Sequence, residues 1–118
     1  MKKMFSLVTC IVLIVILVNA CKKDSENESP QTVDCSTITT TFSGTVLPLM
    51  RSSCAKPDCH ASGSTNGPGA LTNYTQISNV RVKIREVVAS GAMPQDATFS
   101  AQQKAIITCW IDASAPNN

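Results

Sequence analysis

The sequence predicts a small all-α domain of three to four short helices, covering residues 35–118, behind an export signal and a disordered tether. Three observations predict this organisation. An apolar run at the start ends at a small residue and a cysteine, and a polar segment without apolar periodicity follows. The remainder places apolar residues at helical spacing between loops that contain Gly and Pro. A core of this size gains from a covalent link or a bound cofactor.

Residues 1–20 have the features of a secretory signal. Lys2 and Lys3 precede an almost wholly apolar run from Met4 to Val18, and Ala20 stands directly before Cys21. This pattern is typical of a cleaved signal, and the run is shorter than the ~20 residues that a membrane-spanning helix needs. The Ala20-Cys21 junction resembles a bacterial lipobox, so we predict cleavage before Cys21 and lipidation of its thiol. The alternatives are an ordinary signal peptide and a single membrane anchor.

Residues 21–34 are predicted to be the lipidated cysteine and a disordered tether, because they are rich in charge, Ser and Pro. Removing residues 1–20 takes away two lysines and reduces the formal net charge from +2 to zero. No basic patch remains, so we expect no nucleic-acid partner. We expect a lipid anchor in the outer membrane of a Gram-negative cell envelope, with the domain facing the periplasm or the exterior.

Four cysteines remain in the predicted domain once the two in the first 21 residues are assigned to the signal and the anchor. They are Cys35, Cys54, Cys59 and Cys109, and an oxidising compartment does not leave them as free thiols. Four cysteines allow three disulfide pairings. If Cys54 and Cys59 hold a haem, the remaining pair is Cys35 with Cys109, which joins the start of the domain to its last helix.

The first half of the domain begins with extended chain over Cys35–Ser43, where Thr and Ser predominate. A short helix is predicted over Thr45–Ser53, with Pro48 in its first turn, where a missing N–H is harmless. Residues Ala61–Ala70 contain three glycines and a proline, so they form a loop. Such a loop lies against a flat cofactor or simply on the surface.

The second half begins with a short helix that carries Tyr74 and Ile77 and that Thr72 is predicted to cap. The segment Asn79–Ser90 has apolar alternation typical of a strand, but it also has apolar residues on one helical face. We predict a helix there, which ends at Gly91.

The last helix is predicted to begin at Ser100 after a loop over Gly91–Phe99. Ser100 and Gln103 have the spacing of a capping box. Pro116 is expected to end the helix. The predicted buried face consists of Ala101, Ala105, Ile106, Cys109, Trp110 and Ala113.

The segment Cys54–His60 concentrates two thiols and an imidazole within seven residues. Covalent haem attachment uses two cysteines and a histidine directly after the second one, usually as C-x-x-C-H. The spacing here is C-x4-C-H, and Pro57 with Asp58 can turn the longer loop. Met93, in a loop before a proline, is the candidate sixth iron ligand, and a His/Met pair raises the reduction potential.

Two other interpretations of the same residues stay open. Cys54 and Cys59 form a disulfide in a binding or adhesion module without haem, or they join His60 and Met93 in a copper or zinc site. Catalysis is not expected, because a single histidine without paired acidic residues offers little acid–base chemistry.

The domain resembles the class I cytochrome c-like domains found on bacterial lipoproteins, some of which share the C-x4-C-H spacing. The resemblance implies one covalent haem c per chain, His60 as the proximal ligand, Met93 as the distal ligand, and electron transfer with redox partner proteins. It covers nearly everything from Phe42 to Asp112. The matching segments are Val46-Leu47-Pro48-Leu49, Cys54…Cys59-His60, Leu71-Thr72-Asn73-Tyr74, Gly91-Ala92-Met93-Pro94 and Ser100…Ile107…Trp110-Ile111-Asp112.

Overall fold

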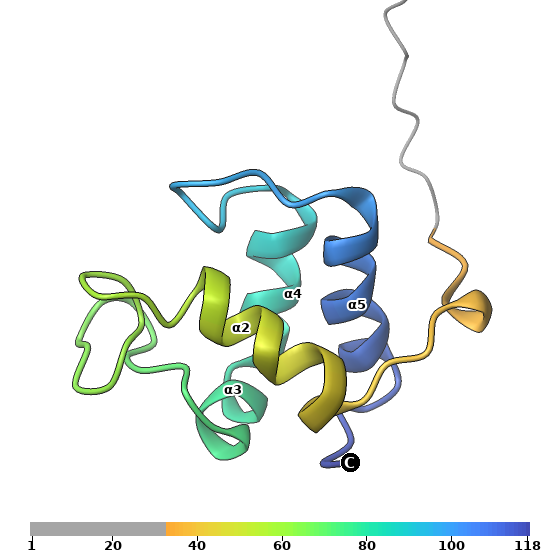
Figure 1. Ribbon diagram of the computed structural model, residues 1–118, viewed down its shortest axis with the longest axis horizontal. Coiled ribbons are helices and arrows are strands. Elements are labelled where there is room, and N and C mark those ends of the chain that lie inside the picture. Colours follow the sequence, from red (N-terminus) through yellow and green to blue (C-terminus); the bar gives the residue numbers. More distant parts are fainter. Residues whose placement is uncertain (1–32) are drawn as a thin grey trace, which may run out of the picture. The chain divides into compact units, whose positions relative to one another are not determined.

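The structure is a computed structural model of the chain and describes residues 33–118 (Figure 1). The predicted signal peptide (residues 1–20), the lipidation site Cys21 and most of the tether lie outside the described residues. The described part of the chain contains helices and no strand, which confirms the all-α class. Within residues 33–118, no helix has both the length and the apolar character that crossing a membrane requires.

The helix predicted over Thr45–Ser53 starts earlier, at Phe42, and a further helical turn precedes it. A single 3-10 turn, η1 (Cys35–Thr37), replaces part of the expected extended chain. A π-helical turn, η2 (Phe42–Val46), then leads directly into α2 (Leu47–Ser53). Thr41 starts η2, because its side chain accepts a hydrogen bond from the Gly44 N–H. Pro48 lies in the first turn of α2, as predicted.

The helices α3 (Tyr74–Asn79) and α4 (Arg81–Ala89) follow, separated by a break at Val80. The prediction of a helix for this segment is correct, and the strand alternative is wrong. Val82 points away from the buried face of α4 and is 75% exposed. The predicted cap is off by one residue, because Asn73 rather than Thr72 accepts the hydrogen bond from Gln76 N.

The helix α5 (Ala101–Asp112) begins with the predicted capping box between Ser100 and Gln103. Its buried face differs from the prediction: Ala101 and Ala113 are exposed, and the face is centred on Trp110. The reason is that α5 packs against both α4 and η2 (Figure 1), so more than one face is covered. The buried residues of α5 are Ala105, Ile107, Cys109, Trp110 and Ile111.

Trp110 lies at the centre of the core and is 0% exposed. Its ring centroid is 5.5 Å from that of Phe42 and 6.5 Å from that of Tyr74. The Trp110 indole N–H donates to the carbonyl of Pro116, and the Tyr74 hydroxyl donates to the carbonyl of Ala115. These bonds satisfy the polar atoms of both aromatic side chains and fix residues 115–116 against the helices.

A disulfide between Cys35 and Cys109 confirms the predicted pairing. The two Cα atoms are 5.5 Å apart, and the residues are 74 positions apart in the sequence. The link therefore joins η1 to the last turn of α5.

Candidate functional site

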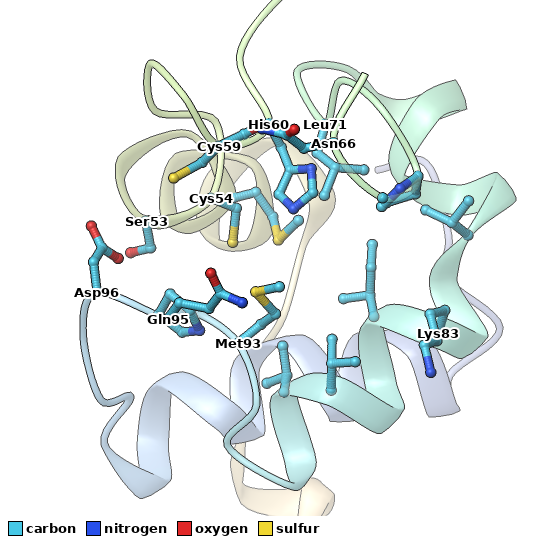
Figure 2. Close-up of a pocket in the computed structure, with 18 of the residues that line it drawn as sticks. Ser53, Cys54, Cys59, His60, Asn66, Leu71, Lys83, Met93, Gln95 and Asp96 are labelled. Atoms are coloured by element: carbon cyan, nitrogen blue, oxygen red, sulfur yellow. The ribbon is translucent and has the colours of Figure 1, made fainter. Parts of the chain in front are cut away.

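A cavity of about 530 Å³ lies between two walls of the domain. One wall comprises the end of α2 and residues 54–71, and the other comprises α4 and residues 93–96 (Figure 2). Cys54, Cys59, His60 and Met93, the four residues predicted to hold haem, all line this cavity. Its apolar lining consists of Met50, Leu71, Val80, Ile84, Val87, Val88 and Pro94.

Local hydrogen bonds fold residues 54–60, here called the cysteine loop, into a compact turn. The Cys54 N–H continues the ladder of α2 by donating to the carbonyl of Met50 at 2.8 Å. The Cys59 N–H donates to the carbonyl of Lys56 at 3.1 Å, and the His60 N–H donates back to the carbonyl of Cys54 at 3.0 Å. Asp58 adopts a left-handed backbone conformation with φ of 64°. The two additional residues of the C-x4-C-H spacing are thereby taken up in the turn.

The two thiols differ in environment. Cys54 is buried and Cys59 is half-buried, and neither forms a disulfide. In Figure 2 the Cys54 sulfur points into the cavity, whereas the Cys59 sulfur lies towards its edge. Burial raises the pKa of the Cys54 thiol to about 11, so this group is protonated at neutral pH.

The orientation of His60 is set by the loop that follows it. Its Nδ1 atom lies 2.9 Å from the carbonyl oxygen of Gly69. A carbonyl oxygen only accepts, so Nδ1 carries the hydrogen and Nε2 keeps its lone pair when the ring is neutral. Gly67, with φ of +50°, passes close to the ring: a Cβ built there would lie 3.8 Å from Cε1 of His60. Residues 61–70 therefore fix the imidazole.

Met93 lies on the opposite wall from His60. In Figure 2 the imidazole and the thioether extend towards each other from the two sides of the cavity. The Met93 N–H donates to the carbonyl of Val87 at 3.0 Å, which ties the segment to α4. Pro94 follows through a cis peptide bond and is buried. Residues 93–96 are here called the methionine segment.

These residues fit the haem that the sequence implies. The cavity has the volume of a small-molecule or cofactor site, and its lining is mostly apolar. It offers two free thiols, an imidazole with an available Nε2 and a thioether, which are the groups that attach and ligate haem c. Among residues 33–118 there is no group of three or more His, Cys, Asp or Glu side chains arranged to hold a metal ion.

Three features of the site were not predicted from the sequence. Met50 is a second methionine of the cavity wall, and it belongs to the α2 core. The Asn66 side chain donates to the carbonyls of Asp58 and Cys59 and so holds the cysteine loop in place. Lys56 and Asp96 form an ion pair across 40 positions of sequence. Of these three features, only Met50 could have been found from the sequence, because the spacing of the apolar residues around it indicates a buried helical side.

Comparison of the chain with protein-family models, with curated proteins and with solved structures found no match. The residues of the cavity therefore carry the functional assignment.

Proposed function

We propose that residues 35–118 form a c-type cytochrome domain that binds one haem covalently and carries single electrons without catalysing a reaction. The observation that carries this proposal is the convergence of Cys54, Cys59, His60 and Met93 on one mostly apolar cavity. Met93 is distant in the sequence from the other three residues, but its thioether and the His60 imidazole lie on opposite walls of the cavity. A His and a Met held in this way are the ligands that a haem iron of this class would take.

Each of the four residues has a distinct role in this proposal. The Cys54 and Cys59 thiols would hold the haem through two thioether bonds to its vinyl groups. His60, with Nδ1–H held by Gly69, would offer Nε2 to the iron. Met93 would offer its sulfur from the other wall. A haem held there supplies reversible one-electron exchange, and the apolar walls keep water from it.

The cellular context follows from the sequence. Lipid on Cys21 anchors the protein to the outer membrane of a Gram-negative envelope, and the tether lets the domain reach redox partner proteins. This placement agrees with attachment chemistry in an exported compartment.

The absorbance spectrum of the purified mature protein tests the proposal. Protein made in a host with haem-attachment machinery is expected to show a Soret band that stays with the protein after acid–acetone extraction. The Cys54→Ala/Cys59→Ala double variant is the control, and its haem is expected to be extracted. A wild-type protein without a Soret band, or with fully extractable haem, contradicts the proposal, and copper bound in its place would favour the copper-site interpretation.

A further inference from the structure

An ion pair joins the two walls of the cavity at its solvent-exposed edge. The Nζ atom of Lys56 lies 2.8 Å from Oδ2 of Asp96, and the two side chains are 35% and 51% exposed. Lys56 stands between the two cysteines of the cysteine loop, and Asp96 ends the methionine segment. Within residues 33–118, no other hydrogen bond or ion pair joins these two segments.

Each partner is fixed in its own wall. The carbonyl of Lys56 accepts the hydrogen bond that closes the cysteine loop, and the methionine segment is bonded to α4 through the Met93 N–H. The hydrogen bond from Lys56 lowers the pKa of Asp96, and the same bond raises the pKa of Lys56. Both groups are therefore charged around neutral pH, and each charge faces its partner.

We propose that Lys56 and Asp96 form a clasp that holds the methionine segment against the cysteine loop and thereby positions the Met93 sulfur in the cavity. Neither residue is a ligand, so both are positioning residues. Without the ion pair, the methionine segment is held only by the α4 side of the cavity, and the Met93 sulfur is exposed more often. The effect is modest, because exposed ion pairs are weak and are screened by salt.

A second ion pair provides a matched control. Lys83 and Glu86 lie 2.9 Å apart, with side chains that are 63% and 68% exposed, but both belong to α4. Glu86→Gln removes a surface ion pair within one wall, whereas Asp96→Asn removes the pair that joins the walls. The double variant Lys56→Asp/Asp96→Lys exchanges the two charges and so restores the attraction between the cysteine loop and the methionine segment.

The first measurement does not depend on haem. The mature chain, as purified, is treated briefly with hydrogen peroxide, and sulfoxide at Met93 and Met50 is quantified by mass spectrometry. In Asp96→Asn, Met93 oxidation relative to Met50 is expected to rise roughly two- to fivefold, the range that a weak exposed pair supports. The charge swap is expected to restore the wild-type ratio, and Glu86→Gln to keep it. An unchanged ratio in Asp96→Asn, or an equal rise in Glu86→Gln, overturns the clasp.

The second measurement rests on the proposed function. In the haem-containing protein, imidazole added to the solution competes with the Met93 sulfur, and its binding is followed by the shift of the Soret band. Asp96→Asn is expected to bind imidazole roughly two- to fivefold more tightly than wild type and Glu86→Gln. Equal affinities overturn the positioning role. Absence of any Soret band refutes the haem proposal but not the clasp, because the ratio of Met93 to Met50 oxidation tests the clasp without haem.

Discussion

The Nδ1 atom of His60 lies 2.9 Å from the carbonyl oxygen of Gly69, so the backbone of the following loop determines which ring nitrogen is free. Nε2 is the ring nitrogen left free to bind a ligand, and Met93 lies on the opposite wall of the cavity. The loop of residues 61–70, which connects α2 to α3 by way of the cysteine loop, thus has a direct role in the site.

Gly69→Ala is expected to disturb His60, whereas Gly63→Ala is not. Both glycines have left-handed backbones, with φ of +86° and +82°, so each substitution costs roughly 1–2 kcal/mol of folding free energy. Only at Gly69 does the new Cβ also crowd the chain, at 3.3 Å from the carbonyl oxygen of Ser64. Nitrogen NMR of the imidazole in haem-free protein is expected to show a single Nδ1–H tautomer in wild type and Gly63→Ala. Equal spectra for Gly69→Ala would contradict the role of this carbonyl.

The starts of two helices show which predictions a local pattern supports and which it does not. Ser100 and Gln103 cap α5 across three positions, so the sequence alone locates this helix start. The earlier start of the first helix involves Phe42, whose N–H donates to the Asn118 side chain 76 positions away. No local pattern encodes that bond.

The site follows the same rule. Cys54, Cys59 and His60 lie within seven residues, so the motif identifies them, but the ion pair between Lys56 and Asp96 joins residues 40 positions apart. The cap of α3 failed for another reason: Thr72 and Asn73 are both good caps. Thr72 instead donates its N–H and hydroxyl to the Gln76 side chain, which leaves Asn73 to start the helix.

Met93→Leu is expected to lower the reduction potential of the haem-containing protein by on the order of 100 mV, because a thioether ligand favours ferrous iron. Covalent attachment is expected to persist, since both cysteines remain. Potentiometric titration measures the change. Met50→Leu is the control: it alters a fully buried methionine of the same cavity that does not take part in the proposed ligation, and its potential is expected to match wild type. Equal potentials for all three proteins would exclude Met93 as a ligand.

The Cys54 thiol is expected to make the haem-free domain less stable at high pH. Its pKa rises from 9.0 to about 11 on folding, so the folded state holds the proton more strongly than the unfolded state. The Cys54 thiol contributes up to roughly 3 kcal/mol to the free energy of unfolding below pH 9. This contribution is lost as the pH rises from 9 to about 11.

Urea unfolding of wild type and Cys54→Ala between pH 8 and pH 11 measures this contribution, and the difference between the two proteins isolates it from other titrating groups. Wild type is expected to lose stability more steeply. Parallel pH profiles would show that the buried thiol does not titrate as described.

Loss of the disulfide is expected to cost roughly 4–5 kcal/mol, because it closes a loop with a sequence separation of 74 residues. Cys35→Ser removes the link at its exposed end and leaves Cys109 buried as a thiol. Urea unfolding is expected to show a much lower midpoint than wild type, and mild reduction of wild type should give the same midpoint. A shift below 1 kcal/mol would show that the helices hold η1 in place without the bond.

The position of that disulfide also determines how mechanical force passes through the molecule. A pull on the chain ahead of Cys35 reaches Cys109 through a covalent bond and enters the fold in the last turn of α5. The covalent path from Cys35 to Cys109 therefore bypasses η2, α2 and the cysteine loop, which follow Cys35 along the chain. Force applied from that side therefore reaches α5, whose residues form much of the core, by a shorter covalent path than it reaches the cysteine loop.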